Sequence, residues 1–219
     1  MALLQESDRQ QIRQRLEAMK DPVQLINFKQ ELECMYCRET RQLLEELAEL
    51  SDKLTLQKYN FQIDSEEART YGIDKIPATI VKSPDKDYGI RYYGIPSGYE
   101  FASLLEDILM VSSGESGLSE QSKAQIRGIQ RPVHIQVFVT PTCPYCPMAV
   151  RLAHQIAMES EYVKADMIES TEFPHLAQKY EVMGVPKTVI NETVTFEGAV
   201  PEEMFVQRVM DAVKMVVSS

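Results

Sequence analysis

The sequence lacks the positive charge that a nucleic-acid-binding protein needs. Its 33 acidic side chains outnumber its 23 basic ones, and the formal net charge is -10. Neutralising phosphate groups requires clustered Lys and Arg, so nucleic acids and anionic membrane surfaces are poor candidate partners. We interpret the charge as mainly keeping the protein soluble.

The sequence also lacks long apolar runs and any cysteine outside a pair. No apolar run approaches the roughly 20 residues that span a bilayer, and no basic start followed by an apolar stretch marks a secretory signal. We therefore expect a cytoplasmic protein. In that compartment paired cysteines usually mean metal binding or redox chemistry, because structural disulfides are rare there. All four cysteines fall in two Cys-x-x-Cys motifs, Cys34–Cys37 and Cys143–Cys146.

An internal repeat relates the two halves of the chain. A shift of 109 positions places both cysteines of the first motif on those of the second. The same shift places Ile76 on Val185 and Pro77 on Pro186. Agreement at both cysteines and at a distant proline is not expected by chance, so we infer two similar units.

The small, polar stretch 112–117 is a predicted linker between these units. It divides the chain into predicted domains 1–114 and 115–219. Each is near the common domain size of about 100 residues.

The expected order of elements is the same in both halves. The first half is predicted to contain helices from Ser7 or Asp8 to Met19, from the first cysteine through 50, before Tyr71 and over 99–111, with strands 23–28, 54–61, 78–82 and 89–93. The second half is predicted to contain helices from near Ser119, from Cys143, before Tyr180 and over 202–217, with strands 133–139, 162–168, 187–191 and 193–196. This order predicts an α/β fold in which each domain is a four-stranded mixed sheet flanked by helices.

The two motifs carry the chemistry of thiol–disulfide exchange. Exchange needs a thiolate, and a free thiol with a pKa of about 8.5 is mostly protonated at neutral pH. Each motif lies where an apolar strand ends and a helix begins, and unpaired N–H groups with the helix dipole favour the anion there. The second cysteine can attack the mixed disulfide that the first one forms. We therefore assign Cys34 and Cys143 as attacking thiols, and Cys37 and Cys146 as resolving thiols.

Two Cys-x-x-Cys motifs can also build a zinc site. Here 105 residues separate the motifs, far more than the roughly 15–20 of a zinc ribbon. Redox chemistry is therefore favoured over structural zinc, and we expect no metal and no cofactor. A bridged iron–sulfur cluster stays open as an alternative.

Pro77 and Pro186 each lie 43 residues after the first cysteine of their motif, at the start of a predicted strand. Proline cannot donate a ladder hydrogen bond, so a proline that opens a strand needs no functional explanation. The shared spacing nevertheless argues for a role in both halves.

These features together resemble the thioredoxin superfamily: a strand, a CxxC motif, a helix, and an Ile/Val-Pro before a hairpin. Two such units in tandem, each with an intact CxxC, resemble the glutaredoxin-like protein disulfide oxidoreductases of archaea and some bacteria over nearly the whole chain. The motif CPYC at 143–146 is of the glutaredoxin type, and CMYC at 34–37 is a looser match.

The resemblance implies further site residues. Pro77 and Pro186 would be cis prolines that face the cysteines, and Ile76 and Val185 would offer backbone groups to an extended substrate segment. Thioredoxins keep a buried acid six positions before the first cysteine.

In this sequence, the residues six positions before Cys34 and Cys143 are Phe28 and Val137. The group that takes the proton of the resolving cysteine is therefore left open. The three histidines show no metal-ligand spacing and no constant distance to a cysteine, and we interpret them as structural or surface residues: His134, His154 and His175.

Two functions fit the sequence. The first is a protein disulfide oxidoreductase that acts on protein substrates through both motifs, with a thioredoxin-reductase-like flavoprotein as the expected electron donor. The alternative is a dedicated relay that carries electrons from a flavoprotein reductase to a peroxidase, as the tandem thioredoxin-like part of the alkyl hydroperoxide reductase flavoprotein implies by resemblance. A metal-binding scaffold is a third reading. The direction of net electron flow depends on potentials and partners, which residues alone do not give.

Overall fold

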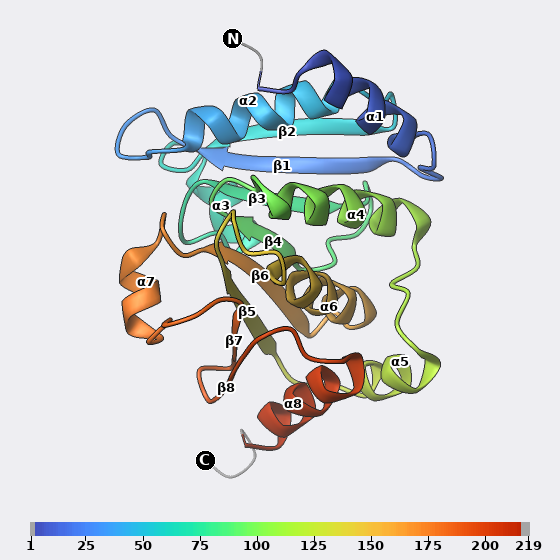
Figure 1. The fold of residues 1–219 in the computed structure, drawn as a ribbon, viewed down its shortest axis with the longest axis vertical. Helices are drawn as coiled ribbons and strands as arrows, with labels where there is room; N and C mark the ends of the chain where they lie inside the picture. Colours follow the sequence, from blue (N-terminus) through green and yellow to red (C-terminus); the bar gives the residue numbers. More distant parts are fainter. Residues whose placement is uncertain (1–2, 216–219) are drawn as a thin grey trace.

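The computed structural model describes residues 3–215 of the chain. Figure 1 shows helices packed around one twisted sheet. The first half contains α1 (Glu6–Leu16), β1 (Val23–Lys29), α2 (Cys37–Ala48), β2 (Leu54–Asn60), α3 (Ser65–Tyr71), β3 (Ala78–Lys82), β4 (Ile90–Tyr93) and α4 (Tyr99–Ser113). The second half contains α5 (Glu120–Arg127), β5 (Val133–Val139), α6 (Cys146–Glu159), β6 (Val163–Glu169), α7 (Pro174–Lys179), β7 (Lys187–Ile190), β8 (Val194–Glu197) and α8 (Glu202–Met215).

Each half forms the predicted four-stranded mixed sheet. In the first, β1 pairs with β2 in parallel and with β3 antiparallel, and β3 pairs with β4 antiparallel. The strands β5 to β8 repeat these pairings. The fold is therefore two tandem thioredoxin-like units, which confirms the predicted fold class.

The two sheets join into one. β4 of the first half pairs in parallel with β6 of the second, from Ile90 beside Ala165 to Tyr93 beside Ile168. The result is an eight-stranded sheet with the order β2-β1-β3-β4-β6-β5-β7-β8. The sequence did not predict this junction, because either edge of a repeat unit offers unpaired backbone groups to another strand.

Alternating side chains of the strands build a core on each face of the sheet. On one face Leu25 packs with residues of α2, α4 and α6. On the other face Ile26 and Phe28 pack with residues of α3 and with Phe173, just before α7. Burial of both faces explains why every residue of the inner strands β3 and β4 is buried.

The ends of the first helix differ from those that the sequence predicted. α1 starts at Glu6, so the predicted start at Ser7 or Asp8 is wrong: both residues lie inside the first turn, and Gln5 precedes the helix without a side-chain cap. α1 ends at Leu16, before the predicted Met19. The predicted helix start near Ser119 is confirmed: α5 begins at Glu120, and the Ser119 hydroxyl caps it by accepting a hydrogen bond from the backbone N–H of Ser122 at 3.2 Å.

The start of the linker also differs from prediction. α4 continues through Ser113 and ends at Gly114, which takes the left-handed conformation common after a helix. The first two residues of the predicted linker 112–117 are therefore helical, and the division at 114/115 stays a prediction. The predicted end of the last helix at 217 lies outside the described residues. Between residues 3 and 215, no helix is long and apolar enough to cross a bilayer.

Candidate active site

The two CxxC motifs lie on one edge of the sheet. β1 and β5 run in the same direction, because β1 and β4 are both antiparallel to β3, while β4 and β5 are both parallel to β6. The motifs follow the ends of β1 and β5, and the loops before α2 and α6 lie on the same side of the molecule (Figure 1). Three strands lie between β1 and β5, so the motifs are four strand spacings apart, roughly 19 Å.

Both motifs form disulfides, with Cα–Cα distances of 5.5 Å. The helices were predicted to begin at the first cysteine of each motif, but α2 and α6 begin at the second. Cys34 and Cys143 therefore lie just before the helix. In the second half, the N–H group that opens the first helical turn nevertheless points toward Cys143. The strand–turn–helix placement on which the redox interpretation depends is therefore present in both halves.

The C-terminal motif is enclosed by its surroundings. Cys143 and Cys146 are both buried. The backbone N–H of Cys146 lies 3.1 Å from Sγ of Cys143 and donates toward it, which favours the thiolate when the pair is reduced. Sγ of Cys143 also lies 3.7 Å from the carbonyl oxygen of Val185, directly before Pro186.

The N-terminal motif is more open. Cys34 is half-buried and Cys37 is buried. The backbone N–H of Gln30 donates to Sγ of Cys37 at 3.5 Å. Glu33, directly before Cys34, adopts a φ of 57°, a left-handed conformation that few residues other than glycine take. The two sites thus differ in exposure and in the groups that contact their sulfur atoms.

The prolines adopt the geometry that the resemblance implied. Both Ile76–Pro77 and Val185–Pro186 are cis peptide bonds. The prolines are held from behind, since their carbonyl oxygens accept hydrogen bonds from Gly94 and Gly198. Among the described residues, the backbone N–H groups of Ile76 and Val185 have no hydrogen-bond partner.

Phe28 and Val137 both lie six residues before a cysteine, but they are not at equivalent positions in the structure. The reason is that the loop after β1 is one residue longer than the loop after β5. In the ladders with β3 and β7, Asn27 pairs with Thr79 as Val137 pairs with Thr188. Asn27, and not Phe28, therefore takes the buried position beneath the N-terminal motif.

Phe28 points to the opposite face of the sheet, where its ring stacks on Tyr59. Asn27 is fully buried, and its amide donates to the carbonyl oxygen of Ala78 at 3.1 Å. Neither an amide nor the valine of the second half can accept a thiol proton at neutral pH.

A carboxyl group that the sequence analysis missed lies beside the C-terminal motif. Glu100 is in the first turn of α4 and is 1% exposed. Burial raises the pKa of Glu100 to about 7, although a hydrogen bond from Ser103 lowers it. The sequence feature that could have indicated its burial is the helical spacing that puts Glu100 on the same buried side of α4 as Leu104 and Asp107.

Two contacts place Glu100 relative to the cysteines. The backbone N–H of Tyr99 donates to the carbonyl oxygen of Pro141 at 3.1 Å, and Asp107 contacts His154 of α6. Hence α4 and α6 run side by side in the same direction (Figure 1). Glu100 precedes Asp107 by seven residues, about 10.5 Å of helix, so it faces the first turn of α6, which begins at Cys146.

Gly98 allows this close approach. A Cβ atom at Gly98 would lie 2.2 Å from the carbonyl oxygen of Pro141, and its φ is 60°. No other residue type fits there without displacing the loop that leads to Cys143. The first half of the chain thereby supplies a wall of the second active site.

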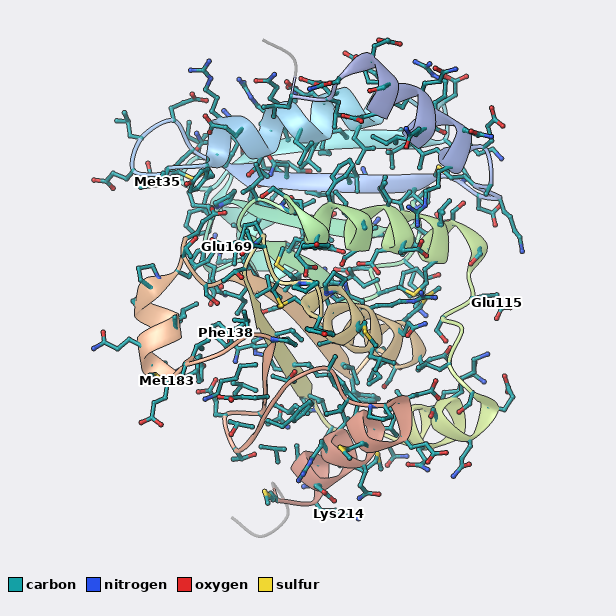
Figure 2. All side chains as sticks on the ribbon, viewed as in Figure 1. Met35, Glu115, Phe138, Glu169, Met183 and Lys214 are labelled. Atoms are coloured by element: carbon teal, nitrogen blue, oxygen red, sulfur yellow. A yellow bond between two sulfur atoms is a disulfide. The ribbon has the colours of Figure 1, made fainter. Side chains whose placement is uncertain are left out.

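Exposed apolar side chains surround both motifs. Met35 is 82% exposed and Met183, just before Val185, is 90% exposed. Both lie on the same side of the molecule (Figure 2). Further exposed apolar side chains lie inside the motifs, within two residues of them, before α3 or at the start of α4: Leu32, Tyr36, Ile63, Tyr99, Tyr145 and Met148. Exposed apolar surface of this kind marks sites of contact with other polypeptides.

The histidines do not gather at the motifs. His134 contacts the carboxylate of Asp166, and His175 lies against the ring of Phe173. His154 is fully buried between the two halves. Within residues 3–215, no group of three or more His, Cys, Asp or Glu side chains could hold a metal ion.

Comparisons with known proteins agree with this geometry. A family described as a thioredoxin domain matches residues 133–211. Among solved structures, the protein disulfide oxidoreductase of Aeropyrum pernix superposes with a TM-score of 0.91 and 32% identity, over 96% of this chain and 94% of that one. The N-terminal domain of the alkyl hydroperoxide reductase AhpF of Enterococcus faecalis superposes with a TM-score of 0.87 and 27% identity, over 94% of this chain and 99% of that one.

Curated relatives are longer than this chain. The AhpF protein of the alkyl hydroperoxide reductase of Pseudomonas aeruginosa is 27% identical over 172 residues, which are 78% of this chain and 31% of that protein. A protein named NADH dehydrogenase from Ferdinandcohnia aciditolerans is 29% identical over 167 residues, 75% of this chain and 30% of that protein. The chain thus spans about a third of the length of the curated relatives that it matches.

Proposed function

Since this chain belongs to the thioredoxin superfamily, we propose that it is a protein disulfide oxidoreductase that exchanges dithiols and disulfides with protein substrates at both CxxC motifs. The observation that carries the proposal is the repeated site: a disulfide-forming CxxC before a helix, with a cis proline in the same half. The similarity to the Aeropyrum pernix protein disulfide oxidoreductase, over nearly the full length of both chains, supports it.

In the proposed reaction, the thiolate of Cys34 or Cys143 attacks one sulfur of a substrate disulfide. A mixed disulfide forms, and the other substrate sulfur leaves as a thiolate that takes a proton from water. Cys37 or Cys146 then loses its proton and attacks the mixed disulfide. The substrate leaves with two thiols, and the site is left as the disulfide seen in the structure. Substrate oxidation is the same sequence in reverse.

Glu100 is the proposed acceptor of the proton of Cys146. It lies beside the first turn of α6, and its pKa of about 7 matches the pH at which a general base works best. The carboxylate takes the proton as Cys146 attacks, and it returns the proton when the site is reduced again. The first half of the chain thereby serves the active site of the second.

We propose that substrates bind at the residues that form the two cis peptide bonds: Ile76, Pro77, Val185 and Pro186. The free backbone N–H groups of Ile76 and Val185 allow an extended substrate segment to pair as an added strand. The exposed methionines beside them adapt their shape to varied side chains, which suits substrates of different sequence.

A flavoprotein related to thioredoxin reductase is the proposed electron donor, and the cytoplasm is the proposed compartment. The relay function, from a flavoprotein reductase to a peroxidase, stays the second candidate. Two observations favour it: the curated relatives that are AhpF proteins of alkyl hydroperoxide reductases, and the structural match to the N-terminal domain of AhpF. The presence of an intact CxxC motif in both halves of the chain favours the general oxidoreductase.

Reduction of insulin disulfides by dithiothreitol tests the proposal. The wild-type chain should accelerate the reaction, and each of Cys34→Ser and Cys143→Ser should retain part of the rate. The double variant should fall to the uncatalysed rate. An unchanged rate in the double variant would show that the cysteines are not catalytic. A dedicated relay would instead reduce a peroxidase disulfide quickly while leaving insulin at the uncatalysed rate.

A further inference from the structure

Four buried polar side chains lie along the contact between α4, β4 and α6. Glu100 and Asp107 come from α4, Tyr92 comes from β4, and His154 comes from α6 of the second half. All four are between 0% and 1% exposed. Ionisable groups so far from water interact strongly with one another, because little solvent screens them.

Most polar atoms of this group are paired. Nδ1 of His154 lies 2.5 Å from Oδ2 of Asp107, and the Tyr92 hydroxyl donates to the same oxygen. The ring of Tyr92 also meets the imidazole of His154 edge-on, with 5.1 Å between the ring centres. Burial and the charge of Asp107 raise the pKa of Tyr92 well above its usual value, so Tyr92 stays a donor.

Two atoms of the group have no partner in the described part of the chain: Oε1 of Glu100 and Nε2 of His154. The other carboxylate oxygen of Glu100 accepts a hydrogen bond from Ser103 at 2.8 Å. Buried polar groups are otherwise satisfied, so an unpaired oxygen on a buried carboxyl beside a redox motif fits a group that accepts a proton.

His154 and Asp107 act on Glu100 in opposite directions. After burial and the Ser103 hydrogen bond, the charge of His154 lowers the pKa of Glu100 and the charge of Asp107 raises it. Tyr92, on β4, is the remaining titratable side chain of the cluster. The state of Glu100 therefore depends on an ion pair whose two members belong to different halves of the chain.

We propose that His154, paired with Asp107, is a positioning residue that keeps Glu100 in its proton-accepting form while Cys146 resolves a mixed disulfide. The inference rests on the proposed function, because it concerns the same site. It assigns a role to the contact between the halves: exchange at the C-terminal motif is regulated by a residue pair that exists only when the halves are joined through β4 and β6.

The expected sign of each substitution follows from the charges. His154→Gln removes the group that lowers the pKa of Glu100 and leaves the anion of Asp107, so the pH midpoint of resolution should rise by about one unit, a tenfold change in the ionisation ratio. Asp107→Asn removes the carboxylate that raises the pKa of Glu100, so it should lower the midpoint. The double variant should fall between the two single variants. A merely structural role would slow all three variants without this order.

The resolution step can be isolated in the full chain with Cys34→Ser and Cys37→Ser. Reaction of the reduced protein with 5,5′-dithiobis(2-nitrobenzoate) releases one thionitrobenzoate when Cys143 attacks and a second when Cys146 resolves. The rate of the second release is measured from pH 5 to pH 9. His134→Gln is the matched control, since His134 also pairs with a carboxylate, Asp166 at 2.6 Å, but on the other face of the sheet.

An upward shift in His154→Gln, with no shift in His134→Gln, would support the inference. An unchanged midpoint in folded His154→Gln would overturn it while leaving the proposed function intact. Absence of the second release in the chain with native His154 would instead contradict the proposed function. If His154→Gln does not fold, NMR of the wild-type chain decides: the imidazole signals of His154 should shift at the titration midpoint of Glu100, and their failure to shift would also overturn it.

Discussion

Replacing Glu100 by glutamine should make the protein more stable at alkaline pH, although it slows exchange. Folding raises the pKa of Glu100 from its usual 4.5 to about 7. The folded state therefore holds the proton more tightly than the unfolded state does, and the contribution of Glu100 to stability is greatest below pH 4.5. That contribution falls as the pH rises from 4.5 to 7 and stays low above pH 7.

The magnitude follows from the size of the shift. At about 1.4 kcal/mol for each pKa unit, the ionised carboxylate costs the fold about 3 kcal/mol. The glutamine side chain of the variant cannot ionise, so the variant loses nothing over this range. Between pH 5 and pH 8 the stability of Glu100→Gln should therefore gain about 2 to 3 kcal/mol relative to the wild type.

Urea unfolding of the oxidised protein at pH 5 and at pH 8 measures this difference. Glu106→Gln is the control, because Glu106 lies on the same helix but is only partly buried and pairs with Arg15. Its stability relative to the wild type should hardly depend on pH. A gain for Glu100→Gln that is equal at pH 5 and pH 8 would refute the assignment of a buried carboxyl with a raised pKa.

Three further predictions concern the asymmetry of the two sites. Cys143 should react with iodoacetamide at lower pH than Cys34, because acidic residues precede Cys34 while the neutral segment around Cys143 leaves its helix terminus unopposed; mass mapping of each cysteine across pH measures this, and equal midpoints would contradict it. Asn27→Asp should introduce a pH-dependent acceleration of exchange at the N-terminal motif and lower thermal stability, since it buries a carboxyl; a flat pH profile would argue against this position as the missing proton acceptor. Gly98→Ala should displace the loop at Pro141 and slow exchange at the C-terminal motif at least several-fold, as judged in single-site variants, and an unchanged rate there would rule out a role for the close approach.

The sequence predicted the local features well, because they depend on nearby residues. Strands β3 and β5 match their predicted ranges of 78–82 and 133–139, and the other strands differ by one residue at one end or at both. The cis bonds at Pro77 and Pro186 are confirmed. They could be predicted because a shared spacing to the cysteines tied each proline to a known pattern, and not because of any property of the prolines alone.

The proton acceptor could not be found in the same way. A single extra residue in the loop after β1 moved the equivalent position from Phe28 to Asn27, and a count of six residues back from each cysteine does not allow for such an insertion. Glu100 was missed because it lies 43 residues before Cys143, in the other half of the chain from the motif that it faces. His154 was interpreted as structural or surface, since its partner Asp107 is also distant in sequence.

What the sequence by itself determined is therefore the repeated unit: its elements, its two CxxC motifs, its prolines and the chemistry of thiol exchange. These follow from hydrophobic period, helix termini and the reactivity of cysteine, which act within short stretches of chain. Only the tertiary structure decided how the units combine. The pairing of β4 with β6 brings α4 of one half against α6 of the other. Burial then gives Glu100 a pKa of about 7, because a carboxyl responds to the groups that surround it in space and not to its neighbours in sequence.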